Sequence, residues 1–276
     1  PEFVARFKAA TTTIDYVPVE QVFHPRGEVR LDASRGERAA MWAQTAANWA
    51  ALGEEMPHYS VVSLEQFRPE SIPETEAEFF DSGEMDCTMI DQALARIDAD
   101  RLREGLCIEV GCGIGRVTRG LARRFDRVLG LDISAPHLAL ARETIAKDGA
   151  ENVELRQVTS VDDYAALPPA SFVFSRFVLH HNVPTVQAAM VESLLAGLAS
   201  PGAMLFQTTD TMDGYRFSPA DYLAEPVTGM ERHCLPQREI YRLVRETGCE
   251  LVEVQRDDTA ATSPHLRSFF YLVAKP

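Results

Sequence analysis

Three glycines at every second position follow a short apolar run near the middle of the chain and form its clearest chemical feature. The run covers residues 107–110 and leads into Gly111, Gly113 and Gly115. Glycine allows a turn to adopt positive φ and carries no Cβ atom that would hold a ligand away from the backbone. A helical pattern follows at once, so the first N–H groups of a helix add donors to the same place. The pattern predicts a strand, a tight turn and a helix start that form a nucleotide-type binding loop.

The spacing around this loop discriminates between nucleotides. A dinucleotide fingerprint, G-x-G-x-x-G, would have its third glycine at position 116, where the sequence has Arg116. An NAD-dependent oxidoreductase is therefore supported only by the presence of a glycine loop, and Arg116 opposes it. Asp132 lies 17 residues after Gly115, at the end of the next predicted strand. A carboxylate at that position can accept hydrogen bonds from both ribose hydroxyls of a bound nucleoside.

The elements that must position these residues alternate between strand and helix from residue 106 onward. Periods of two and of three to four residues distinguish the strands from the helices. Such alternation gives a parallel sheet with helices on both faces. The predicted strands cover residues 107–110, 127–132, 152–158, 172–175, 203–207, 250–255 and 268–274, and the predicted helices cover 116–125, 136–147, 184–198 and 237–247.

The first 100 residues have a different pattern and predict a mainly helical extension. Residues 34–52 form one helical pattern and residues 85–97 another, whereas residues 14–22 fit a strand or an extended arm. Trp42 and Trp49 recur on one face of the first helix. They either pack on the main domain or form a wall of an acceptor pocket. We expect residues 1–100 to be an extension or cap and residues 101–276 to be the ligand-binding domain.

Composition restricts the partners. The 27 Lys and Arg residues against 41 Asp and Glu residues give a net charge of −14, with no basic run. Nucleic-acid affinity depends on clustered positive charge, so a nucleic-acid substrate is not expected. The five cysteines have no C-x-x-C pair, which argues against a metal site or a disulfide framework. No apolar run approaches the length of a membrane span. We expect a cytoplasmic protein that binds neither metal nor membrane; its oligomeric state is not predicted.

Glu109 stands two residues before Gly111, so the loop reads E-x-G-x-G-x-G. This loop resembles the first motif of the class I S-adenosylmethionine-dependent methyltransferases, and residues 172–181 and 198–202 resemble later motifs of the same family. The resemblance implies a Rossmann-like, doubly wound, mostly parallel seven-stranded sheet that ends in an antiparallel hairpin. It implies S-adenosyl-L-methionine as the cofactor, held by Glu109, Gly111, Cys112, Gly113, Gly115, Asp132, Ile133, Ser160, Val161, Asp162 and Phe177. Of these, Asp162 or the Ser160 hydroxyl would contact the adenine, or Asp162 would only cap a turn.

The catalytic groups are less defined. Many family members have an aspartate after the phenylalanine of strand four, but here Val173 follows Phe172. A proton acceptor must therefore come from elsewhere. His180 or His181 has the right chemistry, unless the pair only caps or packs the next helix, and His233 and Tyr215 are rival candidates. Displacement at a sulfonium methyl needs a base only when the nucleophile holds its proton tightly, so positioning alone can supply much of the catalysis.

Two functions from different classes follow from this resemblance. The first is a methyltransferase that acts on oxygen or nitrogen of a small-molecule or glycan-type acceptor. The alternative is an S-adenosylmethionine-binding partner or regulatory protein without transfer activity, motivated by Val173. The least regular segment, residues 208–235, also contains Tyr215 and is long enough to cover an acceptor site.

Overall fold

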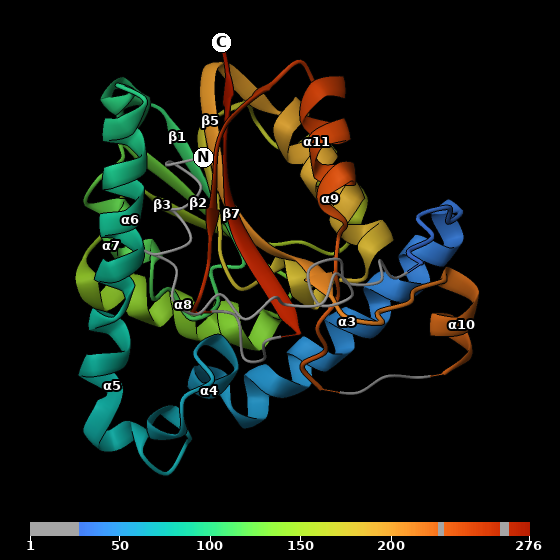
Figure 1. Cartoon of the computed structure of the whole chain (residues 1–276). Helices are drawn as coiled ribbons and strands as arrows, with labels where there is room; N and C mark the ends of the chain where they lie inside the picture. The colour runs from blue at the N-terminus through green and yellow to red at the C-terminus, as the bar shows by residue number, and fades with distance from the viewer. Residues whose placement is uncertain (1–27, 226–228, 260–264) are drawn as a thin grey trace, which may run out of the picture.

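One sheet of seven strands organises the computed structural model, which describes residues 28–225, 229–259 and 265–276 (Figure 1). The order β3-β2-β1-β4-β5-β7-β6 is parallel except at β7, which runs antiparallel to both of its neighbours. This confirms the predicted doubly wound, mostly parallel sheet with a terminal hairpin. The strands are β1 (Leu106–Val110), β2 (Arg127–Asp132), β3 (Val153–Gln157), β4 (Ala170–Ser175), β5 (Leu198–Met212), β6 (Glu250–Arg256) and β7 (Leu266–Lys275).

Helices cover both faces of the sheet. On one face α6 (Gly83–Arg96) and α7 (Thr118–Ala122) enclose a core with the side chains of Phe172, Leu205 and others. On the other face α9 (Pro184–Ala196) and α11 (Gln237–Glu246) form a second core. Figure 1 shows the two helix layers on opposite sides of the strands. The two cores fix the strands, and with them the loops that follow their carboxyl ends.

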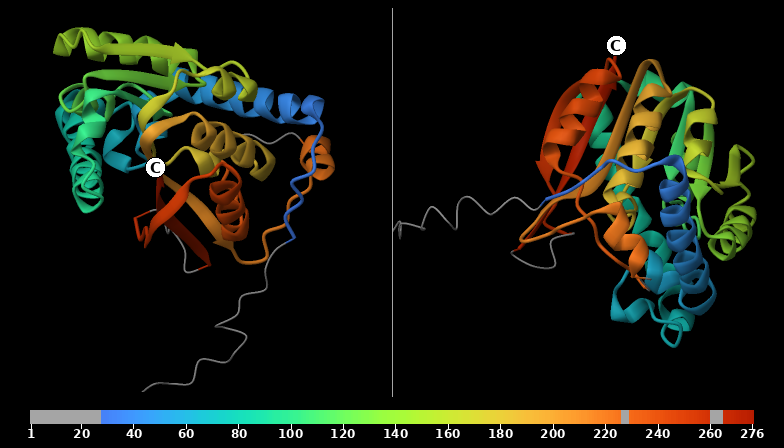
Figure 2. Two further views of the ribbon diagram at one scale, coloured as in Figure 1. Left: turned by 90° about the horizontal axis from the view of Figure 1, so that it is seen from above. Right: turned by 90° about the vertical axis from the view of Figure 1, so that its right-hand side faces the viewer.

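The N-terminal helices lie at the edge where the parallel strands end. They are α3 (Arg35–Glu55), α4 (Pro57–Val61) and α5 (Ile72–Asp81). A capping box between Ser34 and Glu37 begins α3, and Pro57 occupies the first turn of α4. Helix α3 packs against α8 (Ala135–Asp148) and against α10 (Pro219–Ala224), as both views in Figure 2 show. The extension therefore touches elements on both sides of the glycine loop.

Several boundaries differ from the prediction. Strand β5 continues to Met212, five residues beyond the predicted end, because Thr208 and Thr209 are buried and pair with β7. Their polar side chains gave no strand signal. Helices α4 and α5 were not predicted from the sequence. Pro57 and Pro73 interrupt the helical pattern there, but each stands in the first turn of its helix, where proline is tolerated. Residues 14–22 lie outside the described residues.

Two kinds of feature are absent from the described residues. None of the helices found there is both long enough and apolar enough to traverse a bilayer. Among the same residues, no cluster of three or more His, Cys, Asp or Glu side chains has a metal-binding arrangement.

A single methyl group tests the packing of α6 on α7. A Cβ atom at Gly120 would lie 2.2 Å from the Sγ atom of buried Cys87. We expect Gly120→Ala to lower the free energy of unfolding by about 1–3 kcal/mol, because overpacking outweighs the better helix propensity of alanine. Urea denaturation measures the change.

Two further variants make this test specific. Cys87→Ala in the Gly120→Ala background should restore part of the lost stability, because it removes the clashing sulfur. In α3, a Cβ at Gly36 would meet nothing closer than 4.0 Å, so Gly36→Ala should be neutral or slightly stabilising. Equal stability of Gly120→Ala and wild type would show that the two helices separate easily.

Candidate functional site

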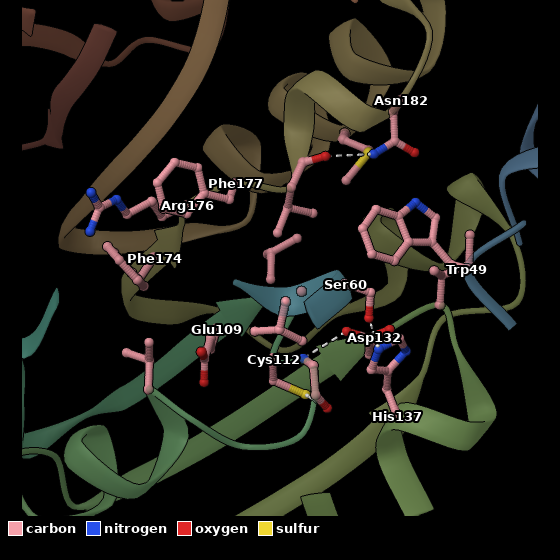
Figure 3. Close-up of a pocket in the computed structure, with 18 of the residues that line it drawn as sticks. Trp49, Ser60, Glu109, Cys112, Asp132, His137, Phe174, Arg176, Phe177 and Asn182 are labelled. Atoms are coloured by element: carbon pink, nitrogen blue, oxygen red, sulfur yellow. Dashed lines mark hydrogen bonds between the residues drawn. The ribbon is translucent and has the colours of Figure 1, made fainter. Parts of the chain in front are cut away.

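A pocket of about 880 Å³, including the open space at its mouth, lies where β1, β2 and β4 end (Figure 3). Its size is that of a site for a small organic ligand. The core domain contributes seven of the residues predicted to bind the cofactor: Glu109, Gly111, Cys112, Gly113, Asp132, Ile133 and Phe177. The N-terminal extension contributes Trp42, Thr45, Trp49, Ser60 and Val61. The pocket is therefore built jointly by the core domain and the extension.

The glycine loop needs its glycines. Gly111, Gly113 and Gly115 have φ values of +76°, +54° and +88°, which disfavour other residues. A Cβ at Gly111 would lie 2.1 Å from Cγ2 of Val178, and one at Gly113 would lie 2.7 Å from Cγ2 of Val61. The loop thus lies directly under side chains that border the pocket, with no room for a Cβ at either position.

Asp132 ends β2 and has both carboxylate oxygens anchored. The N–H of Gly113 donates to Oδ2 and the N–H of Ser134 donates to Oδ1, each at 2.8 Å. Each oxygen has a further lone pair, so the carboxylate can still accept bonds from two hydroxyls. The side chain is preorganised beside the glycine loop, as a ribose-binding acid must be.

A buried histidine connects this carboxylate to the extension. His137, in the first turn of α8, has Nδ1 at 2.7 Å from Oγ of Ser134 and Nε2 at 2.8 Å from Oγ of Ser60. Since Ser60 donates its own proton to the carbonyl of Pro57, it accepts from Nε2–H. Burial lowers the pKa of His137, which favours this neutral form. A Cβ at Gly53 of α3 would lie 2.7 Å from both Nδ1 of His137 and Oγ of Ser134.

Glu109 is an acid inside the pocket wall. It is 3% exposed, and Oγ1 of Thr118 donates to its Oε2 at 2.6 Å. Burial is the main cause that raises the pKa of this carboxyl to about 8, and the Thr118 bond and the Arg116 charge oppose the rise. Glu109 therefore keeps its proton near neutral pH in the ligand-free protein.

The remaining predicted cofactor residues are not among those that line this pocket. Gly115 packs near Thr144, Val161 is part of the core, and the Ser160 side chain accepts from the N–H of Asp162. The Asp162 carboxylate pairs with Arg35 of α3 at 2.8 Å. Asp162 thereby links the extension to the loop after β3.

The three candidate histidines occupy different environments. His180 is completely buried, and burial lowers its pKa well below the usual range. In His233, Nδ1 lies 2.7 Å from the Tyr215 hydroxyl and Nε2 lies 3.3 Å from the Glu231 carboxylate, so both nitrogens are engaged. His181 is only partly buried, and its ring lies 5.1 Å from that of Trp49 between centroids.

The structure also places residues in the pocket that the sequence did not indicate. Ser60 and His137 had no signal, because neither belongs to a motif and their contact joins residues 77 positions apart. Trp49 had one signal, the aromatic face of α3, which left packing and pocket wall as alternatives; it lines the pocket. Trp42 does both, since it lines the pocket and packs edge-on against Tyr164 in the core.

The strand order is that of the Rossmann-like methyltransferase fold, and the glycine loop and the anchored Asp132 have the arrangement of a nucleoside-binding site. Residues 107–202 match the family model described as methyltransferase domain. Residues 107–202 are thus similar to methyltransferase domains, and a solved structure of the same fold holds S-adenosylmethionine.

Individual relatives agree with this family. The chain is 30% identical over 155 residues to a ubiquinone biosynthesis O-methyltransferase of Azoarcus sp. (strain BH72), covering 53% of this chain and 65% of that protein. It is 38% identical over 71 residues to a tRNA/tmRNA (uracil-C(5))-methyltransferase of Citrobacter koseri, covering 26% of this chain and 19% of that protein. The chain thus spans less than two thirds of either relative.

A solved structure supports the fold. Magnesium protoporphyrin IX methyltransferase from Synechocystis PCC 6803, crystallised with S-adenosylmethionine, superposes with a TM-score of 0.55 over 86% of this chain and 97% of that one. At 15% sequence identity this similarity concerns the fold alone.

The buried Glu109 predicts a pH dependence of stability. Its pKa of about 8 in the folded state exceeds the usual 4.5, so the folded protein binds a proton that the unfolded chain releases. The free energy of unfolding should therefore fall as pH rises from about 4.5 to about 8, by at most about 1.4 kcal/mol per pH unit.

Glu109→Gln isolates this contribution. The amide oxygen can keep the bond from Thr118 but does not titrate. The difference in unfolding free energy between variant and wild type, measured by denaturation at several pH values, cancels the contributions of other groups. A difference that stays constant from pH 5 to pH 8 would contradict the assignment.

Proposed function

We propose that this protein is an enzyme that transfers the methyl group of S-adenosylmethionine to oxygen or nitrogen of a small-molecule or glycan-type acceptor. The observation that carries the proposal is Asp132, held by two backbone N–H groups beside a glycine loop that tolerates no Cβ. S-adenosylmethionine supplies a methyl group made electrophilic by the adjacent sulfonium. The protein's part is to bind the nucleoside, exclude water and align the acceptor.

The two parts of the chain have separate roles in this proposal. Residues 101–276 bind the cofactor, and the extension up to residue 100 covers it, as the positions of Trp49, Ser60 and Val61 in the pocket wall support. A pocket that the extension partly covers suits a small acceptor. The net charge of −14 argues against nucleic acid as the acceptor. The alternative of a binding protein without transfer activity is not favoured, since the curated relative from Azoarcus is named as a methyltransferase.

We also propose a cytoplasmic location. Cys87, Cys107, Cys112, Cys234 and Cys249 are all buried and unpaired, as is common in a reducing compartment.

Among the candidate bases, we assign the proton acceptor to His181. None of the three histidines is among the residues that line the pocket, but the His181 ring lies against that of Trp49, which does. Its Nδ1 lies 2.6 Å from the carbonyl oxygen of Glu231. A carbonyl only accepts, so Nδ1 donates its proton and the lone pair of the neutral ring is on Nε2. Burial lowers the pKa of His181 to about 4, which keeps this lone pair available at neutral pH. His180 and His233 are then positioning residues. The His180 carbonyl accepts from the backbone N–H of His233 at 2.7 Å, which holds residues 231–235 against the turn that contains His180 and His181.

Asp132→Asn tests the cofactor site. The amide replaces one acceptor oxygen by a donor, so we expect the affinity for S-adenosylhomocysteine to fall about 100-fold, as for the loss of hydrogen bonds to a charged group. Isothermal titration calorimetry measures it. Asp148→Asn, which alters pairs with Arg119 and Arg123 outside the pocket, should bind as wild type does. No binding of S-adenosylmethionine or its product by wild type would refute the proposed function.

His181→Gln tests the base. We expect kcat to fall about 10²- to 10⁴-fold, while affinity for S-adenosylhomocysteine stays within about twofold. The assay follows S-adenosylhomocysteine formation with whichever of a panel of phenols, sugars and amines the wild type accepts. His265→Gln is the matched control, since His265 is an exposed histidine directly before β7.

The pH profile provides a second readout. With a pKa of about 4, His181 is deprotonated over the whole range tested, so kcat of wild type should be nearly constant from pH 6 to pH 8. If kcat instead fell as the pH was lowered, with a midpoint near pH 6.5, the base would have an ordinary histidine pKa.

A further inference from the structure

A directed chain of hydrogen bonds links α8 to the extension. The Ser134 hydroxyl, which caps α8, lies 2.7 Å from Nδ1 of His137. The other ring nitrogen, Nε2, donates its proton to Ser60 at 2.8 Å, and the Ser60 hydroxyl donates to the Pro57 carbonyl at 3.1 Å. Because Nε2 carries the ring proton, Nδ1 must accept, so the Ser134 hydroxyl donates to it. Each hydroxyl and ring proton in the chain therefore has its own acceptor.

Solvent does not reach this chain of hydrogen bonds. Ser134, His137 and Ser60 are 0%, 1% and 5% exposed. The end of α3 closes on the ring, since a Cβ atom at Gly53 would lie 2.7 Å from Nδ1 and 3.0 Å from Cε1 of His137. The Trp49 ring lies 6.2 Å from the imidazole between centroids. A donor that lost its partner here could not turn to water while the extension stays in place.

Ser134 connects the imidazole to the acid that would bind the ribose. Its side chain bonds to Nδ1 of His137, while its backbone N–H donates to Oδ1 of Asp132 at 2.8 Å. Asp132, His137 and Ser60 all line the pocket, and Figure 3 shows the three side chains close together at one end of it. The hydrogen-bond chain therefore joins the nucleoside end of the pocket to α4.

The extension lies directly on the glycine loop. Cγ2 of Val61, the residue after Ser60, lies 2.7 Å from the position that a Cβ atom would take at Gly113. Val61, Ser60 and Trp49 all line the pocket. A nucleoside bound by Asp132 would thus lie between the core and these residues of α3 and α4. The position of the extension on the core then decides how far the bound ligand is covered.

We propose that His137 is a positioning residue of the transferase, which holds α3 and α4 over the nucleoside end of the cofactor. The cofactor and its product then exchange through a displaced position of the extension, in which the bond between His137 and Ser60 is broken. This inference rests on the proposed function, because it takes the nucleoside of S-adenosylmethionine as the ligand of Asp132. Binding of the nucleoside and docking of the extension share one residue, Ser134.

The Ser60 hydroxyl stabilises only the docked position of the extension. Without it, the Nε2–H of His137 would be buried with no acceptor as long as α4 is docked. In the displaced position the same N–H would be in water, where the hydroxyl is not needed. Removal of the hydroxyl should therefore shift the balance about 10- to 100-fold toward the displaced position, since a buried donor without a partner loses its hydration and gains nothing in return.

Stopped-flow fluorescence of Ser60→Ala tests the inference. The chain has two tryptophans, Trp42 and Trp49, and both are in α3 and line the pocket, so their emission should report ligand binding. The observed binding rate, plotted against S-adenosylhomocysteine concentration, gives the association rate constant as its slope and the dissociation rate constant as its intercept. We expect Ser60→Ala to raise both about 10- to 100-fold, while their ratio changes less than about threefold, because the displaced position admits and releases the ligand alike.

Two variants serve as controls. Ser60→Thr keeps the accepting hydroxyl, so its rate constants should stay close to those of wild type. Ser63→Ala is the matched change from serine to alanine, three residues further along the extension. The Ser63 hydroxyl contacts the Met230 sulfur at the exposed surface, and Ser63 is not among the residues that line the pocket. This variant should exchange the ligand as wild type does.

The inference fails if Ser60→Ala exchanges the ligand at the wild-type rates, since the hydroxyl would then not hold the extension. It also fails if only the dissociation rate constant rises, which would mean that Ser60 contacts the ligand itself. A wild-type protein that binds no S-adenosylhomocysteine would refute the proposed function, and this inference with it.

Discussion

The arrangement of the pocket depends on the two backbone hydrogen bonds that hold the Asp132 carboxylate. One comes from the glycine loop after β1 and the other from the first residues of α8, so a single side chain joins two neighbouring βα units at the edge of the sheet. These bonds set the distance between the loop and β2, and the positive φ angles of the loop follow from that close approach. The carboxylate is rigid without a ligand, which lowers the entropy lost on binding.

Around this anchor, the protein places ionisable groups where water is scarce and uses neighbours to set their protonation. Glu109 is kept neutral by burial, His137 is neutral between two hydroxyls, and His181 is fixed in one tautomer by the Glu231 carbonyl. Arg116 and Arg176, which both pair with the buried Asp86, are the exception, since an arginine does not lose its charge by titration. Each of these groups therefore has one protonation state near neutral pH, which suits a site that must align a donor and an acceptor.

Local patterns allowed the sheet, the loop and Asp132 to be predicted, because each depends on residues close in sequence: alternating apolar residues, glycine spacing and an acid at a strand end. Other features depend on contacts between distant residues and had no local signal. Ser60 meets His137, and Arg176 meets Asp86, across 77 and 90 positions. The prediction also ended β5 too early, since Thr208 and Thr209 look like loop residues until β7 is seen to cover them. The three histidines differ only in their partners, so the sequence could not rank them.

Gly53 has a consequence for how such proteins can be recombined. Because a Cβ at this position would collide with both His137 and Ser134, α3 fits only on a β2–α8 loop with this outline. Extensions are an obvious target for exchange between related enzymes, since they cover the site where acceptors would differ. A chimera that takes residues 28–100 from one enzyme and the core from another inherits this contact as a matched set of three residues. The interchangeable unit is then the extension together with the start of α8, which fixes where a productive crossover point can lie.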